Sequence, residues 1–259
     1  MIEGLIRDDS TRPSLRAFVF PARLLVTLFL LGMAAAFAAG EGNVFATLSE
    51  ADGKPGLAWD DLVRTYHGRP GWTLLASKID GGSMEKHVPI PSEKARLLAW
   101  AGKGGPLEGF EEVREVFSRR CLKCHAPGGE KEDRPFADAR EAGAVHARVA
   151  RYVQPDRGMT LSARATSTHA HLFGLSMVFL LMGGVFLLTN TRRRTKVIVL
   201  SAAFGGMFLD IGSWWLALRG EGFVAGVVVG GALMGLAALV LVVRPLWEMW
   251  GPEPGGLRV

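Results

Sequence analysis

Cys121, Cys124 and His125 are the residues whose types and spacing offer the most specific chemistry in this 259-residue chain. They form the run Cys121-Leu122-Lys123-Cys124-His125, and the chain has no other cysteine. Two thiols at this spacing can add to the vinyl groups of a porphyrin while the adjacent imidazole reaches the iron, which is how c-type haem is attached. The same thiols could instead form a redox pair or half of a zinc site.

The surroundings of the motif favour haem over the two alternatives. A zinc site would favour two further thiol or imidazole ligands, and with no other cysteine two histidines would have to supply them. A redox pair favours the start of a helix, where the thiolate is stabilised. Here the pair ends a helix predicted over 107–120, which carries Phe110, Val113 and Phe117 on one face. We therefore predict one covalent haem c, bound by Cys121, Cys124 and His125.

A helix followed directly by this motif resembles the start of a class I cytochrome c domain. Such domains carry a glycine and an aromatic residue roughly three helical turns before the haem cysteines, as Gly109 and Phe110 do here. The resemblance covers residues 105–165. It implies a small helical haem domain outside the cytoplasm, because covalent haem attachment in bacteria is completed there.

The second axial ligand of the iron is predicted to be Met159. This methionine follows a predicted helix over 136–153 and an irregular Pro-Asp-Arg-Gly run, which suits a loop that brings a ligand over the haem. The order resembles class I cytochromes, whose ligand methionine comes after the attachment motif. His125 and Met159 are therefore the predicted metal ligands.

Three alternatives for that ligand stay open. Met84 and the short helix predicted over 92–100 resemble the methionine loop and last helix of a cytochrome c, placed here before the attachment motif. His169 and His171 are histidine candidates, and a vacant position is the third possibility. Either methionine could also simply fill a gap in an apolar core.

Four apolar segments are long enough to test against the roughly 20 residues that a helix needs to cross a bilayer. The predicted spans are 18–40, 169–190, 197–218 and 222–243. Residues 41–168, rich in glycine, proline and charge, are long enough for a small domain. The predicted fold is mostly α, with one N-terminal and three C-terminal transmembrane helices and an all-α, cytochrome c-like periplasmic domain.

Lysine and arginine near the helix ends predict the topology, because cytoplasmic loops are enriched in these residues. The basic segments 1–17, 191–196 and 244–259 fall on one side, which puts both termini in the cytoplasm and 41–168 in the periplasm of a bacterial inner membrane. The N-terminal segment resembles a secretory signal with small residues over 36–39, and we expect it to remain as an uncleaved anchor. Topology also accounts for the net charge of +5, and no nucleic-acid partner is expected.

His171 and Asp210 are predicted to lie in the outer half of the membrane. Ionisable groups within spans are costly and usually face a partner or a functional cavity. The two could share a proton at a quinone site, satisfy one another structurally, or contact a neighbouring subunit.

These features predict a membrane-bound c-type cytochrome that transfers single electrons within a respiratory or photosynthetic complex. A haem domain tethered at both ends suits a fixed relay better than a mobile shuttle. One alternative is a subunit that oxidises quinol near His171 and Asp210, with the haem as acceptor; another is a scaffold with a structural haem. We expect an electron-transfer subunit rather than an enzyme acting alone. Its expected partners are the lipid bilayer, other membrane redox subunits, and quinol or a soluble cytochrome.

Overall fold

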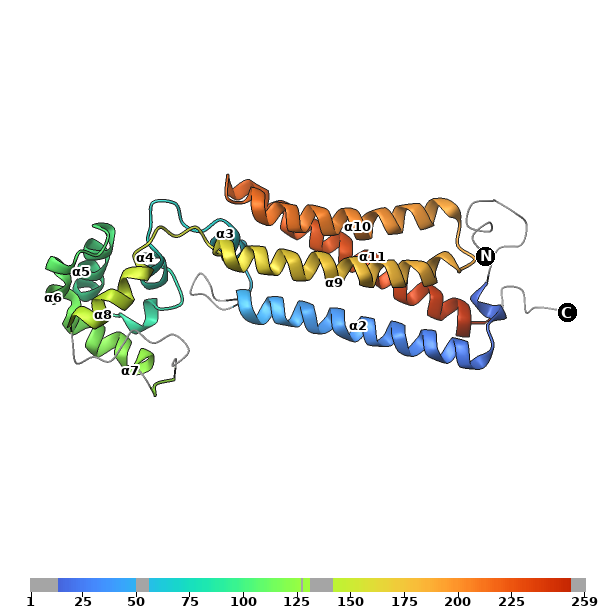
Figure 1. The fold of residues 1–259 in the computed structure, drawn as a ribbon, viewed down its shortest axis with the longest axis horizontal. Helices are drawn as coiled ribbons and strands as arrows, with labels where there is room; N and C mark the ends of the chain where they lie inside the picture. The colour runs from blue at the N-terminus through green and yellow to red at the C-terminus, as the bar shows by residue number, and fades with distance from the viewer. Residues whose placement is uncertain (1–13, 50–55, 127, 131–141, 253–259) are drawn as a thin grey trace. The chain divides into compact units, whose positions relative to one another are not determined.

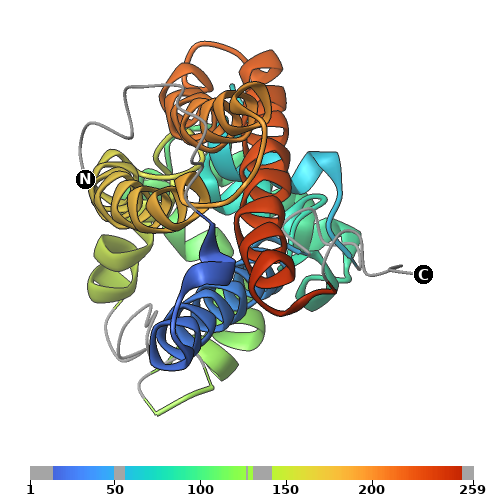
Figure 2. The same ribbon diagram turned by 90° about the vertical axis from the view of Figure 1, so that its right-hand side faces the viewer.

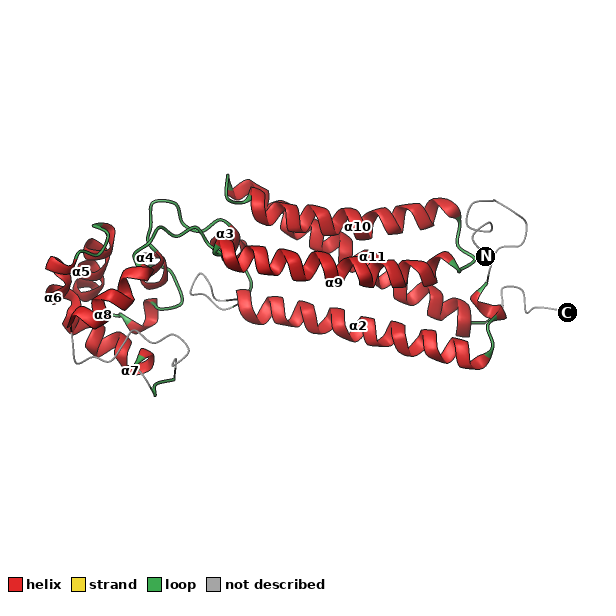
Figure 3. Cartoon of the chain, in the orientation of Figure 1, coloured by secondary structure: helices red, strands yellow, loops and turns green. Residues whose placement is uncertain are grey.

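The computed structural model describes residues 14–49, 56–126, 128–130 and 142–252. These residues form helices and loops with no strand (Figure 3), which confirms the prediction of a mostly α chain. Four helices are long and apolar enough to cross a membrane, as predicted. The chain divides into two compact units, residues 1–43 with 161–259, and residues 44–160.

The first unit contains three of the four candidate spans and most of the N-terminal one, and we call it the membrane unit (Figure 1). Its elements are η1 (Leu15–Ala17), α2 (Phe20–Leu48), α9 (Leu161–Leu187), α10 (Arg193–Leu216), η6 (Glu221–Phe223) and α11 (Val224–Trp250). The helix α2 has 29 residues, about 43 Å at ~1.5 Å per residue, which exceeds the hydrocarbon thickness of ~30 Å.

All four helices differ in extent from the predicted spans: α2 continues to Leu48, beyond the predicted end at 40, and α10 begins at Arg193, before the predicted start at 197. The helix α9 begins at Leu161, before the predicted start at 169, and α11 continues to Trp250, beyond the predicted end at 243. The helix α11 contains Pro245, which removes one backbone hydrogen-bond donor. Transmembrane helices tolerate this loss. Part of the predicted tail, 244–259, is therefore helical, while residues 1–13 and 253–259 lie outside the described residues.

The last turns of α11 carry a buried carboxylate that explains why the helix continues. Glu248 is buried and accepts hydrogen bonds from the hydroxyl of Ser14 at 3.1 Å, from the amide of Leu15 at 3.2 Å and from the amide of Asn190 at 2.8 Å. Arg244 pairs with it at 3.3 Å. A buried carboxylate needs such partners, so Glu248 joins η1, the α9–α10 loop and α11.

The helices α10 and α11 cross with their backbones nearly in contact (Figure 2). A Cβ atom at Gly230 would lie 2.6 Å from the carbonyl oxygen of Gly206 and 2.5 Å from the amide nitrogen of Asp210. One at Gly226 would lie 2.1 Å from the hydroxyl of Ser213. Small residues permit such approach in membranes, where packing rather than the hydrophobic effect joins helices.

The second unit is built from short helices, and we call it the motif unit because it contains the cysteine motif. Its elements are α3 (Trp59–Tyr66), α4 (Leu74–Ile79), η2 (Glu85–His87), α5 (Pro91–Gly102), η3 (Leu107–Gly109), α6 (Phe110–Val116), η4 (Phe117–Cys121), α7 (Leu122–His125), α8 (Ala142–Val149) and η5 (Ala150–Tyr152). The predicted helix over 92–100 corresponds to α5. The N-terminal part of the one predicted over 136–153 lies outside the described residues.

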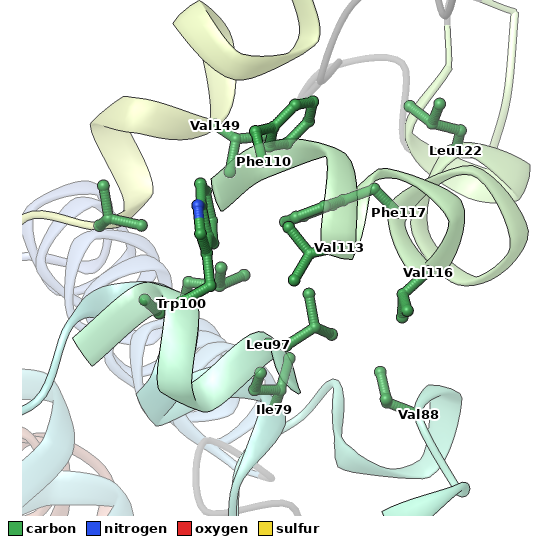
Figure 4. Packing of buried hydrophobic residues seen from close by; sticks show 13 residues of the cluster. Ile79, Val88, Leu97, Trp100, Phe110, Val113, Val116, Phe117, Leu122 and Val149 are labelled. Carbon is green, nitrogen blue, oxygen red and sulfur yellow. The ribbon is translucent and has the colours of Figure 1, made fainter. Parts of the chain in front are cut away.

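A single apolar core holds the motif unit together, and Figure 4 shows its side chains. Trp100 of α5 packs against Phe110 and Phe117, with ring centroids 5.6 and 5.8 Å apart. The Trp100 indole N–H donates to the carbonyl oxygen of Pro106 at 2.9 Å. Gly109 leaves room for the Trp100 ring, because a Cβ atom at Gly109 would lie 3.3 Å from Cδ1 of Trp100. The crossing of α5 and α6 therefore depends on this glycine and aromatic ring.

Candidate haem-binding site

The cysteine motif follows α6 without a break in the helical path. Cys121 ends η4, a π-helical turn, and Cys124 and His125 are the last two residues of α7. The helix ends where the amide of Ala126 bonds the carbonyl oxygen of Leu122 at 3.1 Å. The motif therefore ends a helical run, as the sequence analysis expected, and π-turns of this kind are frequent at functional sites.

The surroundings of Cys121 do not favour a reactive thiolate. Both cysteines are free, and Cys121 borders the apolar core of the motif unit. Burial, and secondly the nearby Cys124, raises the pKa of the Cys121 thiol to about 12. A thiol with such a pKa stays protonated at neutral pH, whereas redox-active pairs depend on a lowered pKa.

The zinc alternative also finds no support in the geometry. Within the described ranges, no three or more histidine, cysteine or acidic side chains gather as a metal site. The donor set at the motif is two thiols and one imidazole on neighbouring helical turns, beside apolar and aromatic side chains. That set suits a porphyrin, which needs two thiol attachment points, one nitrogen ligand and an apolar face.

Met84 lies beside the same core as Cys121. Its side chain and that of Cys121 are both partly buried against the apolar cluster. Met84 immediately precedes η2, and its amide bonds the carbonyl oxygen of Lys78 at 2.9 Å. The preceding turn depends on Gly82, where a Cβ would lie 2.2 Å from the carbonyl oxygen of Ser77.

Ion pairs attach this methionine loop to α5. The ammonium of Lys94 lies 2.7 Å from the carboxylate of Asp80 and also contacts that of Glu85. Glu85 accepts a bond from the amide of Gly81 at 3.0 Å. The hydrogen bond from Lys94 lowers the pKa of Glu85, and bonds to Asp80 and then Glu85 raise the pKa of Lys94. Both residues that flank the Gly-Gly-Ser-Met run are therefore tied to one lysine.

A second ion pair attaches α5 to the segment that precedes Cys121. The guanidinium of Arg120 donates to the carboxylate of Glu93 at 2.8 Å, and the Glu93 side chain is only 10% exposed. Glu93 and Lys94 are neighbours in the first turn of α5. Sequence reasoning missed both, because their partners are distant in the chain and charged residues on a short helix are usually solvated.

Met159 lies at a different place in the motif unit. Its amide donates to the carbonyl oxygen of Thr65, the penultimate residue of α3, at 2.7 Å. Gly158 packs against the same carbonyl, which a Cβ would approach to 2.5 Å. Met159 is not among the described residues that pack against the core bordered by Cys121.

The histidines outside the motif have separate surroundings. His146 bonds the carbonyl oxygen of Gly105 at 2.7 Å and packs edge-on against Trp100 and Phe110, which makes it a core residue of the motif unit. His169 and His171 are on α9 in the membrane unit, and both are exposed.

His171 and Asp210 meet at a shared tryptophan. The His171 ring lies edge-on to Trp214 with centroids 5.2 Å apart, and the Trp214 indole N–H donates to Asp210 at 3.0 Å. His171 also bonds the carbonyl oxygen of Ser167 at 2.8 Å. The buried Arg164 donates to the backbone carbonyl of Trp214 in the last turn of α10. Trp214 and Arg164 were missed from the sequence, and residue 164 fell within the predicted outer domain 41–168.

Comparison with known proteins gave a match for the C-terminal part of the membrane unit. Residues 155–255 are similar to a family described as a transmembrane helical domain. The matched range contains α9, α10 and α11 and does not reach the cysteine motif. Searches of curated proteins and of solved structures gave no significant match. The chain is thus a membrane protein with four candidate spans, in contact with the lipid bilayer.

Proposed function

We propose that this chain is a membrane-anchored c-type cytochrome that passes single electrons within a respiratory or photosynthetic complex. The observation that carries the proposal is the placement of Cys121, Cys124 and His125 at the end of a helical run beside an aromatic core. Bound there, the haem would supply a one-electron carrier that the side chains themselves lack.

Each residue of the motif has a separate role in this proposal. The thiols of Cys121 and Cys124 would form thioether bonds to the porphyrin, and the imidazole of His125 would bind the iron. The apolar core that contains Trp100 and Phe117 would shield one face of the porphyrin from water. Met84 or Met159 would supply the second ligand of the iron; a methionine sulfur would raise the reduction potential and close the iron to other ligands.

The proposed location is a bacterial inner membrane, with the motif unit in the periplasm and both termini in the cytoplasm. Support comes from the charges of the membrane unit. Arg16, Arg244 and the run Arg192–Arg194 belong to the end where Glu248 joins η1 to the α9–α10 loop. The opposite end of the membrane unit has fewer basic residues, with Arg219 in the turn between α10 and α11 and Arg164 near the start of α9. This asymmetry is the one that the positive-inside rule requires.

A redox titration of the purified full-length protein tests the electron-transfer proposal. We expect the haem spectrum to change reversibly between reduced and oxidised forms, with the dependence on potential of a single one-electron centre. A haem that neither reduces nor reoxidises over the accessible range would contradict the role as a carrier and support the structural-haem alternative.

A second candidate function is quinol oxidation, favoured by the contact of both His171 and Asp210 with Trp214. Each quinol would release two electrons, which the haem would take one at a time, and two protons, which these side chains would accept. We expect a quinone analogue to slow quinol-driven haem reduction if this site operates, and Asp210→Asn to slow it likewise. An unchanged rate with both would eliminate this candidate while leaving the carrier role intact.

A further inference from the structure

Two neighbouring residues of α5 hold the two chain segments that border the core beside Cys121. Glu93 pairs with Arg120, the residue before Cys121, and Lys94 pairs with Asp80 and Glu85, on either side of Met84. We propose that Glu93 and Lys94, which we call the α5 bracket, position Met84 as the second axial ligand of the haem iron. The inference rests on the proposed haem site and deepens it.

Met84 fits this role better than Met159 because of where each side chain packs. Met84 and Cys121 both lie against one apolar cluster, which also contains Val88 and Val116. Val88 is four residues after Met84 and Val116 is five before Cys121 (Figure 4), so both segments enter the same core. Met159 is instead held by its backbone at the end of α3.

The loop that carries Met84 needs an external restraint to hold a ligand in place. Gly81 has a φ of +66°, and Gly82 fits only without a Cβ. Glycine loses more conformational freedom on folding than other residues, so a glycine turn is costly to fix. Lys94 bridges Asp80 and Glu85 and thereby closes the loop over this turn.

The packing of α5 on α6 bears on the unusual chain order. In the class I pattern the ligand methionine follows the attachment motif, whereas Met84 precedes it here. The helix α5 packs on α6 through Trp100, Phe110 and Gly109, so the helix after the methionine loop lies against the helix before the motif. Met84 can therefore approach the haem site even though it precedes the motif in the chain.

The test uses the full-length protein purified with its haem, and imidazole as a competing ligand for the ferric iron. Met84→Ala is expected to abolish the weak far-red band that a methionine sulfur gives on ferric haem, and Met159→Ala to leave it unchanged. Lys94→Met should raise the apparent imidazole affinity by about two- to five-fold, because a partly exposed ion pair biases the loop by that factor.

Three further variants isolate the bracket from general effects on stability. Lys94→Arg should restore the parent imidazole affinity, since it keeps the positive charge. Glu93→Gln should raise that affinity, because it weakens the more buried pair with Arg120. Arg114→Met removes the exposed pair with Glu111 in α6, and should change nothing.

The outcomes separate this inference from the proposed function. Loss of the far-red band in Met159→Ala but not in Met84→Ala would overturn the assignment of the ligand. Equal imidazole affinities in the parent, Lys94→Met and Glu93→Gln would overturn the role of the bracket. Absence of covalent haem from the parent protein would instead refute the haem site itself, before any variant is compared.

Discussion

Gly230→Leu is expected to prevent α10 and α11 from packing and to leave little folded protein in detergent extracts. A Cβ at this position would lie 2.5 Å from the amide nitrogen of Asp210 and 2.6 Å from the carbonyl oxygen of Gly206. Both are backbone atoms of a helix, which cannot rotate away as a flexible side chain can. Overpacking commonly costs about 1–3 kcal/mol and sometimes more, and contacts this short belong at the upper end.

The adjacent glycine provides the matched control for this experiment. A Cβ at Gly231 would meet nothing within 4 Å, so Gly231→Leu places the same side chain one residue along the same helix in open space. The yield of monodisperse protein and its thermal midpoint should fall only for Gly230→Leu. Equal behaviour of the two variants would show that α10 and α11 do not cross at these residues.

Trp100→Ala is expected to destabilise the motif unit by about 3–5 kcal/mol, the usual cost of truncating a large aromatic core residue. Trp100 is 5% exposed, contacts Phe110, Phe117 and His146, and donates a hydrogen bond to Pro106. Its loss would leave a cavity where α5 crosses α6. Hydrogen exchange of the full-length protein should show faster amide exchange throughout this core.

Trp59 allows the same substitution at an exposed site of the same unit. This residue is 49% exposed at the start of α3, so Trp59→Ala should leave exchange in α5 and α6 unchanged. Similar exchange in Trp100→Ala and in the parent protein would mean that the aromatic cluster does not hold the motif unit together.

The membrane unit could be predicted well from the sequence because a bilayer imposes a simple rule on length and hydropathy. The ends of the helices could not. The helix α11 continues through Pro245 since Glu248 gains partners in η1 and the α9–α10 loop, contacts that join distant parts of the chain. The start of α9 was missed because the polar residues after Leu161 offer no apolar run, although Arg164 among them is buried.

The candidate site was predictable only as far as its chemistry is local. Cys121, Cys124 and His125 lie within five residues of one another, so the motif and the haem hypothesis could be read from the sequence. The sequence could not show which residues surround Met84 and Met159. Met84 packs against the apolar cluster and the Met159 amide bonds Thr65, and both contacts are tertiary. The ion pairs of Glu93 and Lys94 bridge segments far apart in the chain, which no periodic pattern reports.

The most direct test of the central claim is a search for covalent haem on the unfolded protein. The full-length chain would be produced in a bacterium that attaches haem to a co-produced reference cytochrome, then denatured and examined by haem staining and intact mass. We expect haem on the parent band and none on the double variant Cys121→Ala, Cys124→Ala. A parent chain without haem, beside a reference cytochrome that carries it, would refute covalent haem attachment. Cys121 and Cys124 would then be free thiols.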